Sequence, residues 1–298
     1  MCVASMASLH NTSDAENKTG VTELRTAMEV RPKRSFWNVL IGIPPHAQLI
    51  RLLAADELRR HYVGSMLGAL WLVVKPLLVV SVYIVLFGVV FRARVGPAHA
   101  PMEYALVLLA GLLPWLIFAE SLTAATGSVA SKGGLATKVR FPIEILPIAT
   151  VLASTLSGLV GLCLFLLALA VLKPFGGALL LLPLLLAAQL LFTLGLAWTL
   201  SAFNVVVRDV SQILPLAMTG WLFLSPVVYT AEMVPEPLAR AFALNPMAYF
   251  LDSYRAILLA NQPPTIHQCG VIGLVAVGTF LAGCWIFDRL RGTIAECL

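Results

Sequence analysis

The sequence has little charge for its length. Of its 298 residues only 12% are charged and 59% are hydrophobic, with a mean hydropathy of +0.91. Soluble domains carry about 25% charged residues, because polar side chains must cover most of the surface that faces water. The composition therefore argues strongly against a soluble protein and favours one that is surrounded by lipid.

The sequence also lacks motifs for bond chemistry. Its five cysteines form no CxxC pair, which argues against a zinc or redox site. It contains neither a GxxxxGK[ST] phosphate loop nor an HExxH metal pair, and its acidic residues form no DxD pair. We therefore expect no catalytic residue, no metal and no bound cofactor on this chain.

The net charge of +5 does not come from one long cluster of basic residues. The lysines and arginines are dispersed and lie mainly between apolar stretches, so a nucleic-acid partner is not expected. Residues 1–35 are polar and lack the apolar core of a signal peptide. Residues 1–44 are therefore predicted to form a cytoplasmic N-terminal tail.

Several apolar stretches are long enough to cross a bilayer, which takes about 20 residues in a helix. The sequence predicts an all-α integral membrane protein with six transmembrane helices. They are expected at about 66–91, 104–126, 143–172, 178–203, 211–230 and 268–287.

The distribution of basic residues predicts the orientation of these spans. With the N-terminus inside, fourteen lysines and arginines fall on the cytoplasmic side and five on the other. The positive-inside rule then places both termini in the cytoplasm, including a C-terminal tail at 291–298.

The segment from Pro44 to Tyr62 has the pattern of an amphipathic helix. Apolar residues recur at helical spacing, and the charged positions between them include Arg51, Arg59 and Arg60. We expect a helix lying on the cytoplasmic membrane surface with its basic side toward phosphate headgroups. A short soluble helix before the first span is the alternative.

Residues 232–264 are apolar in places but do not read as a span. Arg240, Asp252 and Arg255 interrupt the stretch, and Asn245-Pro246 breaks any helix near its middle. Short re-entrant helices at the outer face, before the last span, are predicted here, since irregular backbone at membrane depth must be buried in protein or line a wet cavity. An ordinary extracellular loop is the alternative.

A few charged residues fall inside predicted spans, where ionisable groups are costly, and Lys75 and Glu120 are singled out among them. Lys75 lies near the inner boundary and is expected to snorkel to it. Glu120 either faces an aqueous path or makes a polar contact between helices. Aromatic residues near the span ends indicate an interfacial belt or, alternatively, a stacking surface for sugar rings.

Ordered motifs along the chain resemble the permease subunits of ABC-2 polysaccharide exporters, the O-antigen, capsule and teichoic-acid family. The matching segments are HYVGSMLGALW at 61–71, GLLPWLIFAESL at 111–122, KVRFPIEILP at 138–147, RDVSQILPLAMTGWLFLSPVVYT at 208–230 and NPM at 245–247. The resemblance covers a transmembrane domain at 45–290. It departs from the family at Asp56-Glu57 and His61-Tyr62, where the family often has Arg-Asp before a basic-Tyr pair.

The resemblance implies a homodimer in the bacterial inner membrane, docked on two copies of a separate ATPase subunit that binds ATP and Mg²⁺. The substrate would be a lipid-linked polysaccharide such as O-antigen or capsule. The loop at 131–142 would contact the ATPase, through Lys132, Lys138, Arg140, Phe141 and Pro142. The surface helix would line the cytoplasmic entry of the polymer path, with Tyr62 at its end. The first and fifth spans would lie beside the path, which adds Trp71, Phe87, Trp221, Phe223 and Tyr229.

Two other functions stay open at this point. An ion-coupled secondary transporter should show inverted repeats and paired ionisable residues near the bilayer midplane. An integral-membrane glycosyltransferase should show clustered carboxylates. Neither pattern is evident in the sequence.

Overall fold

The computed structural model describes residues 46–60, 66–83, 85–86, 101–132, 142–227 and 244–297. Within this part of the chain the secondary structure is helical, with no strand. All of it lies in one compact unit that comprises residues 39–298. The predicted tail at 1–44 falls outside the described residues.

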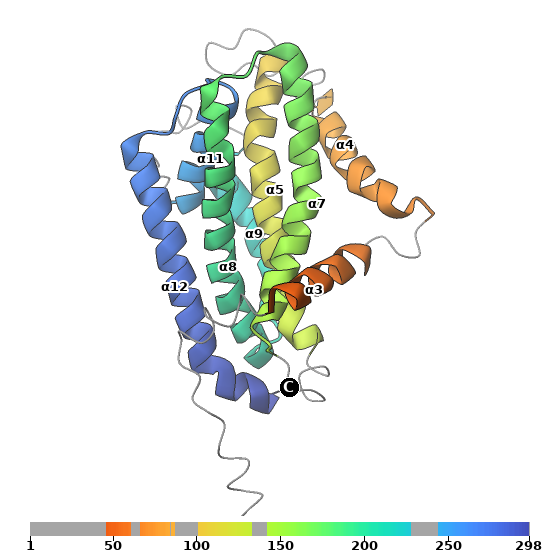
Figure 1. The fold of residues 1–298 in the computed structure, drawn as a ribbon, viewed down its shortest axis with the longest axis vertical. Helices are drawn as coiled ribbons and strands as arrows, with labels where there is room; N and C mark the ends of the chain where they lie inside the picture. Colours follow the sequence, from red (N-terminus) through yellow and green to blue (C-terminus); the bar gives the residue numbers. More distant parts are fainter. Residues whose placement is uncertain are drawn as a thin grey trace, which may run out of the picture. The chain divides into compact units, whose positions relative to one another are not determined.

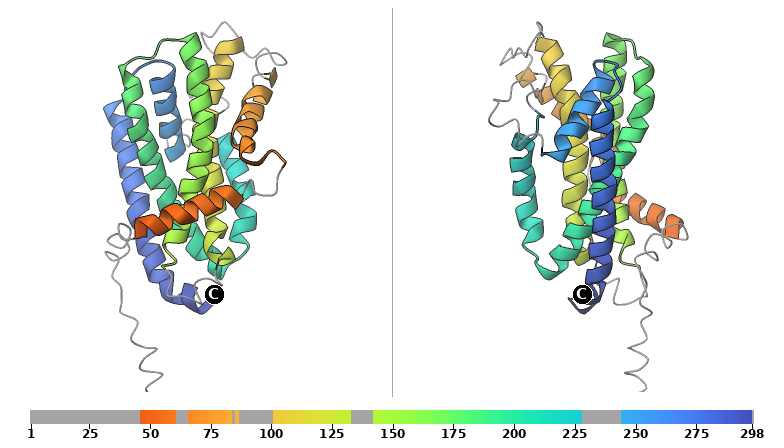
Figure 2. Two further views of the ribbon diagram at one scale, coloured as in Figure 1. Left: turned by 45° about the vertical axis from the view of Figure 1, so that its right-hand side comes forward. Right: turned by 90° about the vertical axis from the view of Figure 1, so that its left-hand side faces the viewer.

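Four helices are long and apolar enough to cross a membrane. They are α5 (Pro101–Ser131), α7 (Ile145–Leu172), α8 (Leu182–Val206), which the 3-10 turn η4 (Gly177–Leu181) precedes, and α12 (Ile266–Cys297). Figures 1 and 2 show them side by side along the long direction of this unit. Each coincides with a predicted span: α5, α8 and α12 extend it at one or both ends, and α7 starts two residues later and ends at the same residue.

Two further apolar helices occupy the remaining predicted spans but are shorter. The helix α4 (Trp71–Tyr83) follows the 3-10 turn η2 (Gly68–Leu70), and α9 (Val210–Leu224) follows α8. At 13 and 15 residues, both are shorter than the roughly 20 residues that a bilayer crossing needs. The described residues thus establish four candidate spans of the six predicted.

The amphipathic helix is present as α3 (Ala47–Arg60), which lies across the long helices and packs on α7 (Figures 1 and 2). Ile50 and Ala54 are buried, while Arg51, Arg59 and Arg60 are exposed. The helix therefore has a buried apolar side and an exposed basic side, as the helical spacing of these residues predicts.

The helix α11 (Pro246–Leu258) begins where the sequence predicts a break. Asn245 caps its N-terminus, with the side chain accepting a hydrogen bond from the Met247 amide, and Pro246 occupies the first turn, where its missing N–H costs nothing. Residues 232–243 of the predicted outer-face segment lie outside the described residues.

The long helices are joined by close backbone packing and by polar contacts. Gly195 of α8 and Gly283 of α12 face each other so closely that a Cβ on either would overlap the backbone of the other helix. Small residues permit such a close approach of two helices. The resulting dispersion attraction holds helices together in a membrane, where the hydrophobic effect does not drive them to associate. Gln189 of α8 donates to the Pro114 carbonyl of α5 at 2.9 Å.

Candidate functional site

A cleft of about 420 Å³ opens among α3, α4, α5, α7 and α9. Its apolar walls include Leu58, Ala119, Ala153, Pro215 and Met218. Hydroxyl groups from α5 and α7 interrupt these walls. They belong to Thr123, Ser154 and Ser157. The cleft is thus amphipathic, with a volume typical of small-molecule sites, which span about 300–1,000 Å³.

The cleft contains the two intramembrane charges singled out in the sequence. Lys75 of α4 donates from Nζ to Oε1 of Glu120 on α5 at 2.7 Å. Both side chains stay partly exposed, at 59% and 43%, so the pair faces the cleft rather than a closed core. Pairing with Glu120 explains how Lys75 is accommodated among apolar helices.

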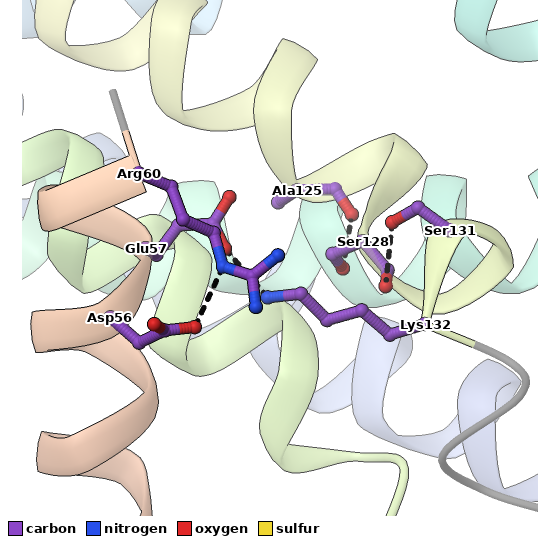
Figure 3. Close-up of polar contacts among 7 residues, drawn as sticks. All are labelled: Asp56, Glu57, Arg60, Ala125, Ser128, Ser131 and Lys132. Atoms are coloured by element: carbon purple, nitrogen blue, oxygen red, sulfur yellow. Dashed lines mark hydrogen bonds and ion pairs between the residues drawn. The ribbon is translucent and has the colours of Figure 1, made fainter. Parts of the chain in front are cut away.

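The lower end of α5 is joined to α3 by a second ion pair (Figure 3). Lys132 donates to Oε2 of Glu57 at 2.6 Å, and the two side chains are only 14% and 19% exposed. Above it, Ser128 and Ser131 bond back to carbonyls of their own helix. The last described residue before the 133–141 segment is thus tied to the surface helix.

A neighbouring ion pair, Arg60 with Asp56, is exposed and lies within α3. Arg60 donates from Nε to Oδ2 of Asp56, one helical turn earlier, at 2.7 Å (Figure 3). The hydrogen bond and charge of Asp56 raise the pKa of the Arg60 guanidinium above its ordinary value. Asp56 and Glu57, where the sequence departs from the family pattern, are therefore both partners of basic side chains.

The other flank of the 133–141 segment is fastened to α12. Arg291 donates from Nη2 to both carboxylate oxygens of Glu144, at 2.7 and 2.6 Å, and the Glu144 side chain is 8% exposed. The Trp198 indole of α8 donates to the Glu144 carbonyl at 3.0 Å. Residue 291, predicted to begin a tail, continues α12 instead and holds the start of α7.

An aromatic cluster joins α9 to the bundle. Trp221 packs edge to face on Trp115 and Phe118, and Phe118 stacks on Phe192. The Trp221 indole also donates to Oδ1 of Asn245 at 3.0 Å. Trp221 is therefore fixed in place by packing and by one hydrogen bond.

Asn245 connects three segments at this end of the bundle. Besides accepting from Trp221 and from the Met247 amide, it donates from Nδ2 to the Leu224 carbonyl and to Oγ of Ser225. One side-chain amide thereby uses its acceptor and its donors together. The Asn-Pro dipeptide does more than break a helix, since it joins the end of α9 to the start of α11.

Arg255 of α11, predicted as part of the outer-face segment, is almost buried, with 11% of its side chain exposed. It donates to the carbonyls of Val107 and Val227 and lies 3.6 Å from Asp252. Gly111 of α5 leaves room for it, since a Cβ there would lie 2.7 Å from Nη2 of the guanidinium. Arg255 thus anchors α11 to α5.

The sequence-predicted aromatic path residues are only partly described. Trp71 is half-buried near Lys75, Trp221 belongs to the aromatic cluster, and Phe223 is 64% exposed. Tyr62, Phe87 and Tyr229 lie outside the described residues. Whether these aromatics border a polymer path stays a prediction.

The predicted ATPase-contact residues divide in the same way. Lys132 and Pro142 are described, with Lys132 paired to Glu57, whereas Lys138, Arg140 and Phe141 lie outside the described residues. Their role stays a prediction. No group of three or more metal-ligating side chains occurs in the described part of the chain.

Sequence reasoning missed the partners of these charges. It singled out Lys75 and Glu120 separately but did not pair them, and it gave no role to Glu57, Glu144 or Arg291. The pairs join residues 45, 75 and 147 positions apart. The only sequence signal available was that an ionisable residue in an apolar environment needs a partner of opposite charge.

Comparison with known proteins identifies the family. Residues 48–259 match the family described as ABC-2 type transporter. The chain is 33% identical over 260 residues to the O-antigen export system permease protein RfbA of Myxococcus xanthus, an alignment that covers 84% of this chain and 95% of that protein.

Other relatives agree with this match. An O-antigen export system permease protein RfbA of Klebsiella pneumoniae is 27% identical, covering 84% of this chain and 95% of its own. The inner membrane transport permease YadH of Escherichia coli K12 is 27% identical, covering 74% and 88%. With its four membrane-length helices the chain is a multi-pass integral membrane protein, and it belongs to the ABC-2 type transporter family.

Proposed function

We propose that this chain is the transmembrane permease subunit of an ABC exporter that moves a lipid-linked polysaccharide across the bacterial inner membrane. The observation that carries the proposal is the 33% identity to a protein named as an O-antigen export permease, in an alignment that covers 95% of that protein. O-antigen or a capsular polysaccharide is the expected cargo. The chain supplies the path, and a separate subunit binds and hydrolyses ATP with Mg²⁺.

Deletion of the gene tests the cargo. The mutant should lose one surface glycan and accumulate the corresponding lipid-linked polymer inside the cell, and the gene carried on a plasmid should restore export. If every surface glycan is made and displayed normally in the mutant, the proposed cargo is wrong.

We infer a topology of six spans with both termini in the cytoplasm, and outer-face helices that include α11. The asymmetry of fourteen against five basic residues supports this orientation. A cysteine placed at His99 should react with an impermeant reagent in intact spheroplasts, and one at Gly133 only after permeabilisation. Labelling of the Gly133 position in intact spheroplasts would contradict the topology.

We infer that the ATPase docks on the loop centred on residues 133–141. The two ion pairs that flank it support this, because Lys132–Glu57 and Glu144–Arg291 connect its ends to different helices, α3 and α12. A displacement of the loop by the ATPase would therefore be transmitted to both the surface helix α3 and the last span α12. Coupling between two sites requires such contacts to differ between the states of the partner.

Charge reversal of the loop tests this coupling. The double variant Lys138→Glu with Arg140→Glu should insert normally but lose ATPase binding or export. The matched control is Lys173→Glu, which reverses one exposed basic charge at the far end of α7. Unchanged export by the double variant would exclude an essential electrostatic role for the loop.

We infer that two copies of the chain form the path, with α4 and α9 beside the shared axis. Aromatic faces allow a sugar polymer to slide through shallow contacts without fixing its sequence. Leucine at Trp71, Phe87, Trp221, Phe223 and Tyr229 together should slow export while expression and ATPase binding persist. Export at the parental rate in that variant would leave the interfacial belt as the explanation.

A further inference from the structure

The Lys75–Glu120 pair lies in an environment that needs an explanation. Lys75 belongs to an apolar helix and Glu120 to a candidate membrane span, yet neither side chain is enclosed by this chain. Charges at membrane depth occur where protein, water or another polar group solvates them. The ion pair satisfies each charge on one side, and its exposed side leaves room in the cleft for a further polar group.

The position of the cleft indicates the depth of that group. One wall is Leu58 of α3, the amphipathic helix whose charged face is exposed, and such helices lie at the boundary between headgroups and acyl chains. The cleft extends from this helix into the space between α4 and α5. It thus lies where the headgroup of a membrane lipid can reach it from the side.

The charges in the cleft have opposite signs, and each has bonding capacity left. Their mutual bond uses one Nζ–H of Lys75 and Oε1 of Glu120. An ammonium has three donors and a carboxylate two acceptor oxygens, so two N–H groups and Oε2 remain for a ligand. A ligand that matches both must carry an anion and a cation a few bonds apart.

We propose that this cleft binds the headgroup of a zwitterionic phospholipid, phosphatidylethanolamine, with its phosphate on Lys75 and its ammonium on Glu120. The hydroxyls of Thr123 and Ser154 offer further donors to phosphate and ester oxygens. The alanine, proline and methionine side chains of the walls suit the glycerol and the first acyl carbons. This assignment does not depend on which polymer is exported.

Other lipids match the pair less well. Phosphatidylglycerol offers a phosphate to Lys75 but no cation to Glu120, and the Glu120 carboxylate repels its anionic headgroup. Phosphatidylcholine carries a cation without N–H groups, so it cannot donate to Oε2. The ammonium of phosphatidylethanolamine makes a charge-assisted hydrogen bond, which is the stronger kind.

Native mass spectrometry of the full-length protein tests the proposal. The protein is titrated with phosphatidylethanolamine, phosphatidylcholine and phosphatidylglycerol of identical acyl chains, and the dissociation constant of the first bound lipid is read for each. The parental protein should bind phosphatidylethanolamine about tenfold more tightly than phosphatidylglycerol, the factor that a hydrogen bond to a charged group supplies.

Two charge-neutralising variants separate the roles of the charges. Glu120→Gln should lose the preference for phosphatidylethanolamine over phosphatidylglycerol, and Lys75→Gln should weaken the binding of both lipids. The matched control is Glu103→Gln with Lys173→Gln, which neutralises one exposed glutamate on α5 and one exposed lysine at the end of α7. The control should bind like the parental protein.

The exchange variant Lys75→Glu with Glu120→Lys keeps the experiment decisive if a single variant fails to fold, because it retains an ion pair. It should still prefer phosphatidylethanolamine. Equal affinity of the parental protein for the three lipids would overturn the proposal. So would binding of a polyprenyl diphosphate in the cleft without any phosphatidylethanolamine, which would assign the cleft to the transport substrate.

Discussion

Helices α8 and α12 differ from helices α4 and α9 in how much of their surface is packed against the rest of the chain. Between α8 and α12 the backbones meet at Gly195 and Gly283, with no room for a Cβ. By contrast, no described residue of α4 is buried, and Leu214 and Met218 are the buried residues of α9. Large apolar side chains of α9, such as Leu216 at 75% exposure, have no cover from this chain.

Helices α8 and α12 hold each other through a contact within the chain, whereas α4 and α9 leave most of their surface uncovered. The α8–α12 contact is specified within one chain, by the absence of side chains at two positions. The outer faces of α4 and α9 are apolar without being buried, so lipid or a second copy must cover them. Substitutions in the first pair should thus affect folding, whereas those in the second should affect assembly.

The largest expected effect comes from filling the α8–α12 contact. Gly283→Val would place a branched side chain against the Gly195 carbonyl, so the helices would have to separate. We expect a loss of more than about 3 kcal/mol in the free energy of unfolding, beyond ordinary overpacking. Thermal unfolding in detergent measures it. Gly278→Val is the control, because nothing lies within 4 Å of a Cβ at that position.

The next effect is loss of the clamp at the end of α12. Arg291→Met would leave the Glu144 carboxylate, 8% exposed, without its cation. Unpairing a buried charge costs about 3–5 kcal/mol, and the partial exposure of Arg291 reduces this to about 2 kcal/mol. Arg289→Met removes an exposed arginine two residues earlier and should be neutral. Equal melting temperatures for both variants would show that the clamp contributes nothing to stability.

A smaller effect is expected where α9 joins α11. Asn245→Ala would remove the cap of α11 and leave the Trp221 indole without its acceptor. We expect about 1–2 kcal/mol of destabilisation, as for other lost N-caps. Hydrogen exchange should increase at the start of α11, and the exposed Gln262→Ala should show no such increase. Unaltered exchange in the Asn245 variant would mean that packing alone holds this corner.

The smallest effect on stability, and the sharpest on assembly, concerns the exposed face of α9. Cysteine at Leu216 should leave folding unchanged but form a disulfide between two copies if that face lies at the dimer axis. Leu274 of α12 is the control, because it is 77% exposed on the tightly packed pair and should not cross-link. Cross-linking through Leu274 alone would move the dimer axis to the other side of the molecule.

Helix positions were predictable from the sequence, whereas side-chain partners were not. Hydropathy located α5, α7, α8 and α12, and helical periodicity located α3 with its buried Ile50 and Ala54. Those signals depend on neighbours along the chain. Likewise, Asn245-Pro246 predicted the start of α11 from local backbone chemistry alone.

The ion pairs depend on how distant helices meet. Nothing near Lys132 indicates Glu57, and nothing near Glu144 indicates Arg291, because each pairing requires the packing of α3 on α7 or of α12 on α8. The same holds for the Lys75–Glu120 cleft. Sequence alone could show that Glu120 needs a polar partner or an aqueous path, but not which of its neighbours supplies it.

The close contact of α4 with α7 has a mechanical consequence. A Cβ at Gly161 would lie 2.9 Å from that of Pro76, so this contact is the point about which α4 would turn, with Val79, Val80 and Tyr83 sliding on the core against which they pack. Tyr83, seven residues beyond Pro76, has a lever arm of about 10 Å at 1.5 Å per residue. A rotation of about 10° would carry Tyr83 by about 2 Å. Lys75, next to this contact, would barely move, so α4 could swing while its ion pair with Glu120 stayed intact.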